Sequence, residues 1–134
     1  MTLYLLDTNI VSYLVKGNSP AARSRLMAVP GPSVVVSVIT EAELRYGVAK
    51  RGEPAVLKKA VDGFLARVRV LPWSRDAAQA YARMRVRREA VGMPLGPMDM
   101  LIAAQAKAAG AVLVSSDAAF GSFPDGLQLE DWSK

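Results

Sequence analysis

A chain of 134 residues that contains no cysteine and no histidine cannot form disulfides, thiolate or imidazole metal sites, and it cannot use imidazole in acid–base catalysis. Hydrophobic residues make up 51% of it, which indicates a folded globular chain of a size that suits one core, so we expect a single domain over residues 1–134. The net charge of +5 fits either a solvated surface or a polyanionic partner such as a nucleic acid.

The apolar stretches are short and are interrupted by proline, glycine or charged residues, so none of them predicts a transmembrane helix. The first apolar segment begins almost at Met1, which leaves no room for the basic and apolar regions of a secretion signal. We therefore expect a soluble cytoplasmic protein that is not associated with a membrane.

Apolar periodicity and turn residues predict an alternation of strands and helices along the chain. In chain order we expect strand 2–6, helix 8–15, helix 20–28, strand 34–38, a helix capped by Thr40, helix 54–66, strand 68–71, helix 75–91, helix 98–109, strand 112–115, a helical turn at 118–120 and strand 127–130. Such alternation favours parallel pairing through crossover connections. The predicted fold is therefore an α/β three-layer α/β/α sandwich with a mainly parallel central sheet.

The helix after the second strand carries a capping-box pattern. Thr40 is followed three residues later by Glu43, and Ile39 and Leu44 occupy the positions of a hydrophobic staple. The pattern predicts that Thr40 is the N-cap of this helix and that Glu43 lies in its first turn.

Four acidic residues stand where predicted strands and helices meet. Asp7 follows the first strand, Glu43 follows the second, Asp99 opens an alanine-rich helix and Asp117 follows the fourth strand. In open parallel sheets, ligands bind beyond the carboxyl ends of the strands, so these four side chains can converge at one edge. Four close carboxylates repel one another, and a divalent cation would offset that repulsion.

Each of these acids also has a purely structural interpretation. Asp7, Asp99 and Asp117 are each placed to cap a helix, and Glu43 could simply complete its capping box. The remaining acids are interpreted as ordinary solvated or turn residues: Glu41, Glu53, Asp62, Asp76, Glu89, Asp125, Glu130 and Asp131. With no histidine or cysteine, an all-oxygen site would suit magnesium, manganese or calcium.

Basic residues cluster in a way that favours a polyanionic partner. Arginines at 83, 85, 87 and 88 crowd the helix predicted over 75–91, and Lys50-Arg51 adds another cluster. Of these we expect Arg83, Arg87 and Lys50 to contact a phosphate backbone.

The segments that carry the four acids resemble the PIN-domain ribonucleases, and in particular the VapC toxins of type II toxin–antitoxin modules. The similarity rests on Leu6-Asp7-Thr8-Asn9, on Ser37 to Gly47, on Asp99 to Ala104 and on Leu113 to Asp117, and the C-terminal residues 127–132 are also similar. It spans essentially the whole chain in the expected order.

The resemblance implies that Asp7, Glu43, Asp99 and Asp117 bind Mg²⁺ or Mn²⁺ and catalyse the hydrolysis of RNA. It also implies that three polar neighbours shape the pocket, namely Thr8, Asn9 and Ser115. The expected partners are a VapB-type antitoxin and a second copy of the chain. The loop 92–99 is similar to that of a subgroup that cuts initiator tRNA, which makes tRNA the favoured substrate.

These features together predict metal-dependent phosphodiester hydrolysis, in which one or two bound ions activate water and stabilise developing charge. Two alternatives remain open. A non-catalytic nucleic-acid-binding α/β module would explain the basic charge but not the four acids. A phosphoacceptor receiver domain would share the architecture, but it would need paired acids after the first strand and a lysine after a late one.

Overall fold

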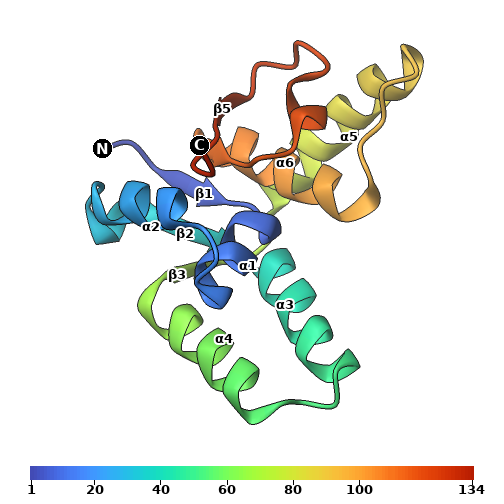
Figure 1. Cartoon of the computed structure of the whole chain (residues 1–134). Helices are drawn as coiled ribbons and strands as arrows, with labels where there is room; N and C mark the ends of the chain where they lie inside the picture. The colour runs from blue at the N-terminus through green and yellow to red at the C-terminus, as the bar shows by residue number, and fades with distance from the viewer.

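The computed structural model describes residues 1–134 and shows five strands, six α-helices and two short 3₁₀ helices (Figure 1). The strands are β1 (Tyr4–Leu6), β2 (Val34–Ser37), β3 (Arg69–Leu71), β4 (Val112–Val114) and β5 (Gln128–Glu130). The helices are α1 (Thr8–Lys16), α2 (Pro20–Met27), η1 (Gly31–Ser33), α3 (Val38–Lys50), α4 (Ala55–Arg67), α5 (Arg75–Ala90), α6 (Pro97–Ala109) and η2 (Ala118–Gly121).

The predicted start of α3 is wrong. The helix begins at Val38, and its N-cap is Ser37, whose Oγ accepts a hydrogen bond from the Ile39 N–H at 3.0 Å. Serine at the end of β2 is itself a good N-cap, so the chain enters the helix directly from the strand. Thr40 therefore lies buried in the first turn, and Glu43 lies in the second turn rather than in a capping box.

The five strands form one parallel sheet in the order β3-β2-β1-β4-β5, which confirms the predicted fold class. A receiver-type sheet has a different strand order, so that alternative is wrong. The chain builds the sheet outward from β1 to β3 and then returns to add β4 on the other side of β1. The gap between β1 and β4 is thus the point at which the direction of winding reverses, where open α/β sheets bind their ligands.

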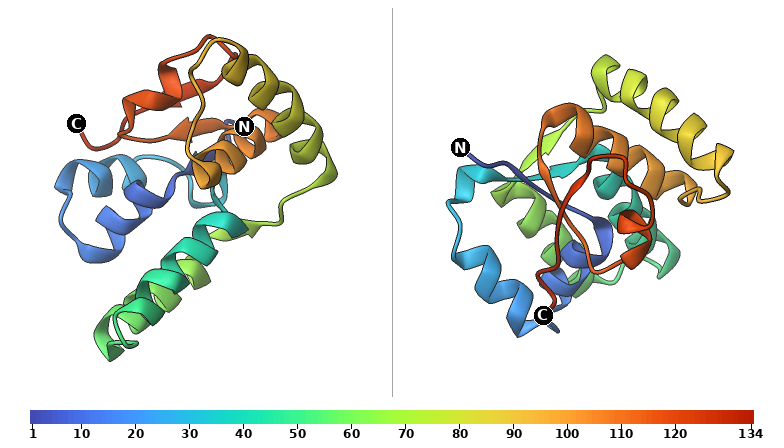
Figure 2. Two further views of the ribbon diagram at one scale, coloured as in Figure 1. Left: turned by 90° about the vertical axis from the view of Figure 1, so that its right-hand side faces the viewer. Right: turned by 90° about the horizontal axis from the view of Figure 1, so that it is seen from above.

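Helices cover both faces of the sheet because the strand residues alternate between two cores. Leu5, Val35 and Leu113 face α5 and α6, whereas Leu6, Val36 and their neighbours face α1, α2, α3 and α4. The two sets are in register, since Leu5 pairs with both Val35 and Leu113. Figure 2 shows the resulting layers, with the hairpin of α3 and α4 extending away from the sheet.

The C-terminal residues belong to this core. β5 pairs with β4, and Trp132 is fully buried, with its ring centroid 5.4 Å from that of Tyr4. None of the helices combines the length and the apolar character that crossing a bilayer requires.

Candidate functional site

Asp7 is a buried carboxylate at the carboxyl end of the central strand. It is the N-cap of α1, and its Oδ1 accepts a hydrogen bond from the Ile10 N–H at 2.9 Å. Its Oδ2 accepts a hydrogen bond from Ser115 Oγ at 2.5 Å, across the gap between β1 and β4. Its side chain is therefore held in one orientation, while each oxygen keeps a second lone pair.

The pKa of Asp7 is raised to about 6, mainly by burial and to a smaller extent by the negative charges of Asp99 and Asp117. The hydrogen bonds from Ser115 and Ile10 act in the opposite direction but do not compensate for the loss of water. Burial also raises the pKa of Asp99, and the charges of Asp117 and Glu43 add to that effect. Each of the four acids is thus close enough to at least one other for their charges to repel, and Asp99 interacts with all three.

Ser115 connects two of the acids. Its Oγ donates to Asp7 and also accepts a hydrogen bond from the Asp117 N–H at 2.9 Å. Asp117 itself is exposed and caps η2, since its Oδ1 accepts from the Ala119 N–H at 2.9 Å. The structural role expected for Asp117 is therefore present, and its second oxygen has no partner within the chain.

Glu43 is oriented by two threonines from two different helices. Thr8 Oγ1 donates a hydrogen bond to Glu43 Oε1 at 2.6 Å, and Thr8 Oγ1 lies 3.1 Å from Thr40 Oγ1. The role of Thr40 in this contact was missed at the level of sequence, because its spacing to Glu43 also fits a capping box. Of the expected polar neighbours, Thr8 contacts Glu43, whereas the side chain of Asn9 is exposed.

None of the four acids forms an ion pair, although the chain has 17 Lys and Arg. Six other acids are paired with lysine or arginine: Glu41, Asp62, Glu89, Asp125, Glu130 and Asp131. The mutual repulsion of the four carboxylates is therefore not offset by any cation of the chain.

The donors fit a hard divalent ion, since all are carboxylate or hydroxyl oxygens. No three acids lie close enough together to hold a metal ion in the arrangement seen here. Glu43 is partly buried on α3, Asp99 is partly buried in the first turn of α6, and Asp117 is exposed. Binding would therefore require side-chain rotation of these acids toward Asp7, which is already fixed.

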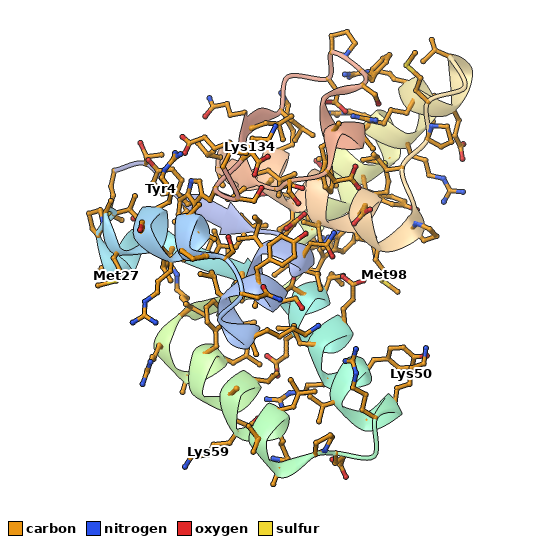
Figure 3. All side chains as sticks on the ribbon, in the orientation of Figure 1. Tyr4, Met27, Lys50, Lys59, Met98 and Lys134 are labelled. Atoms are coloured by element: carbon orange, nitrogen blue, oxygen red, sulfur yellow. The ribbon has the colours of Figure 1, made fainter.

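The basic residues divide into exposed and buried ones. Arg83 and Arg87 are exposed on α5, and Lys50 is exposed in the last turn of α3, with its Nζ 5.9 Å from the Tyr46 ring centroid. In Figure 3, Lys50 lies at the outer end of α3, far from Met98, which precedes Asp99 in the first turn of α6.

Two sequence interpretations are wrong in this region. Arg88 is fully buried and contacts no solvent, so it cannot belong to a basic face that meets a nucleic acid. Asp125, interpreted as a solvated turn residue, is buried and pairs with Arg88 at 2.7 Å. The two residues are 37 positions apart in the sequence, so no local sequence pattern predicts their contact.

The chain matches known proteins over nearly its whole length. Residues 4–125 match the family model described as PIN domain. The chain is 32% identical over 133 residues to the tRNA(fMet)-specific endonuclease VapC of Shigella flexneri, covering 99% of this chain and all of the relative. It is also 32% identical to the ribonuclease VapC2 of Rickettsia felis, over 98% of this chain and 99% of the relative.

Solved structures agree with this match. The structure of VapBC2 from Rickettsia felis bound to a promoter DNA fragment superimposes with a TM-score of 0.89 at 31% identity, over 98% of this chain and 99% of that chain. The DNA-bound VapBC from Salmonella typhimurium superimposes with a TM-score of 0.90 at 31% identity, with the same coverage.

Proposed function

Since this chain belongs to the PIN-domain family and has VapC ribonucleases as its homologues, we propose that it hydrolyses RNA with the help of a divalent cation held by Asp7, Glu43, Asp99 and Asp117. The observation that carries this proposal is the group of acids beyond the ends of β1 and β4, which repel one another and have no basic partner. When bound, Mg²⁺ or Mn²⁺ supplies Lewis-acid polarisation of the phosphate and lowers the pKa of a coordinated water.

Neighbouring residues hold or orient two of the four carboxylates. Asp7 is the fixed point of the site, because the Ile10 N–H and Ser115 Oγ hold both of its oxygens. Thr8 directs the carboxylate of Glu43 from the side of α1. Partners that orient a metal ligand in this way commonly contribute a factor of about 10 to 100 in affinity or activity.

Two properties of the site support a role for metal rather than for side-chain acid–base chemistry. The chain has no histidine, so the usual imidazole route of metal-independent ribonucleases is closed to it. The raised pKa of Asp7 reflects the cost of an ionised carboxylate in a buried position, and a cation would lower that cost.

Replacing Asp7 by Asn and Asp99 by Asn tests this function directly. We expect both variants to lose RNA cleavage in Mg²⁺, and we expect EDTA to stop the wild-type protein. The exposed acid Asp76, which has no partner in the chain, offers a matched control, and D76N should cut normally. Wild-type cleavage by D7N and D99N, or cleavage that persists in EDTA, would contradict the proposal.

The same experiment addresses the non-catalytic alternative. A nucleic-acid-binding module would bind RNA in all of these variants without cutting it and would show no acid-dependent uptake of Mn²⁺ in calorimetry. The names of the relatives favour the ribonuclease, since they are described as an endonuclease and a ribonuclease.

Substrate and partners are inferred from the relatives. The Shigella relative is named for tRNA(fMet), so we propose a tRNA, and initiator tRNA first, as the substrate. Exposed Arg83, Arg87 and Lys50 are our candidates for contact with its backbone. Mapping the cut sites on total RNA after brief induction would identify the target.

The similar solved structures are VapBC assemblies, so we propose a VapB-type antitoxin as the partner of this chain, which would act as a cytoplasmic toxin and form a homodimer. We also propose that residues 1–134 form one PIN domain. The pairing of β5 with β4 and the burial of Trp132 support this extent, because they tie the last residues to the same core.

A further inference from the structure

Arg88, near the end of α5, is an arginine with no exposed surface. Its guanidinium donates to acceptors in two separate segments of the chain: to Asp125 Oδ2 at 2.7 Å, to Phe120 O at 3.0 Å, to Met93 O at 3.3 Å and to Ser122 Oγ at 3.4 Å. A single cation therefore joins the end of one helix to two segments whose own backbone hydrogen bonds are local, such as that from the Asp125 N–H to Phe123 O.

Both segments carry proposed ligands of the carboxylate site. Met93 lies in the turn between α5 and α6, and α6 has Asp99 in its first turn. Phe120 is part of η2, the short helix that Asp117 caps, and Asp125 follows it. The guanidinium of Arg88 thus connects the segment before Asp99 to the segment after Asp117.

Burying this cation has a cost that an apolar side chain would avoid. The free-energy cost of removing an arginine and an aspartate from water often exceeds the gain from their mutual attraction. Replacing such a pair by apolar residues is therefore often neutral or stabilising. The pair is also incompletely satisfied, since Asp125 Oδ1 is buried without a hydrogen-bond partner. Stability alone is therefore a poor explanation for Arg88.

The planar guanidinium offers what an apolar side chain cannot, namely several donors in fixed directions. Its four contacts reach two backbone carbonyls and two side chains that are 5 to 37 residues away in the sequence. Such contacts determine where the two segments lie relative to each other, because each carbonyl must stay in line with its donor.

We propose that Arg88 is a positioning residue for the carboxylate site: it holds the segments of Asp99 and Asp117 in place, so that both side chains can rotate toward Asp7. Arg88 does not touch the site itself and acts only through these two segments. The inference rests on the proposed function in one respect, since it assumes that the acids bind a cation.

The test replaces the ion pair by apolar residues, in the double variant R88M/D125L, and measures Mn²⁺ binding by calorimetry on the folded, full-length chain. We expect the variant to keep a cooperative melting transition but to bind Mn²⁺ about tenfold more weakly, as is common when a group that orients metal ligands is removed. In the metal-free state we also expect faster amide hydrogen exchange in residues 93–99 and 117–126.

The matched control is R85Q, one turn earlier on the same helix. Arg85 is exposed and bonds only to Glu89 and Tyr81, so its loss should leave Mn²⁺ affinity and hydrogen exchange unchanged. D125N serves as a second variant, because asparagine has the shape of aspartate and can still accept from Arg88 Nε. It should weaken Mn²⁺ binding in the same direction but less, and it decides the question alone if the double variant does not fold.

Two outcomes separate this inference from the proposed function. If D99N weakens Mn²⁺ binding but folded R88M/D125L and D125N bind as the wild type does, the role of Arg88 is refuted and the proposed site stands. If D99N itself leaves Mn²⁺ binding unchanged, the carboxylate site is refuted, and the inference about Arg88 falls with it.

Discussion

The buried position of Asp7 predicts that removing its charge will stabilise the metal-free protein while abolishing its activity. Asp7 is 3% exposed, and burial raises its pKa from the ordinary 3.8 to about 6. One pKa unit corresponds to about 1.4 kcal/mol, so the ionised carboxylate destabilises the fold by about 3 kcal/mol at neutral pH. The amide side chain that D7N introduces carries no such charge.

The sign of the pH dependence follows from the direction of this pKa. Between pH 3.8 and about 6 the folded state holds a proton on Asp7 that the unfolded state has released, so the free energy of unfolding falls as the pH rises through this range. The advantage of D7N should therefore be close to zero at pH 4 and reach about 3 kcal/mol at pH 8. For a chain of this size that corresponds to an increase in melting temperature of about 10 °C.

The assay is chemical and thermal denaturation of the wild type and D7N in EDTA, at pH values from 4 to 8. Asparagine is as good an N-cap as aspartate, and its oxygen can still accept from the Ile10 N–H. Its amide nitrogen then takes the place of Oδ2 and can donate to Ser115 Oγ, so the substitution removes the charge and reverses the direction of one hydrogen bond. D76N, which removes an exposed acid, should show no such gain. Equal stability of D7N and wild type at pH 8, or a gain that does not depend on pH, would refute the reasoning.

Two further predictions concern the orientation of Glu43 and the contacts of basic residues with the RNA backbone. Replacing Thr8 by Val removes the hydroxyl that donates to Glu43 Oε1, so RNA cleavage should fall about tenfold while T8S retains most of it; unchanged cleavage by T8V would contradict this role. If Arg83 and Arg87 contact phosphates, R83Q/R87Q in a D7N background should reduce the salt dependence of RNA binding by about 0.7 in log–log slope per lost contact. The charge-matched control K59Q/R67Q on α4 should leave that slope unchanged, and an equal change in both variants would show that only net charge matters.

Local patterns were sufficient for most of the fold. Short apolar segments that alternate with amphipathic ones identified the strands and helices to within two residues, except for the start of α3 and for η1, which was not predicted. There, Ser37 and Thr40 are both good cap residues; Ser37 caps the helix, and Thr40, inside its first turn, contacts Thr8 across 32 positions. A propensity argument has no access to a contact of that range.

The candidate site was only partly accessible in the same way. Asp7, Asp99 and Asp117 could be recognised by their places after a strand or at a helix start, because those places depend on neighbouring residues, whereas Glu43 lies in the second turn of α3. Their mutual approach depends on β4 returning to the side of β1, which is a property of the strand order and not of any segment. The bridge from Asp7 to Ser115 spans 108 positions and exists only because these two strands are neighbours.

The parallel α/β architecture, the lack of any histidine or cysteine ligand and the junction positions of Asp7, Asp99 and Asp117 could all be inferred from the sequence alone. These follow from composition and from periodicities of a few residues. The tertiary structure decided which basic residues are available to a partner, since Arg88 looks like its exposed neighbours but is buried against Asp125. Burial depends on what the rest of the chain packs over a residue, and for Arg88 that is a segment more than thirty positions away.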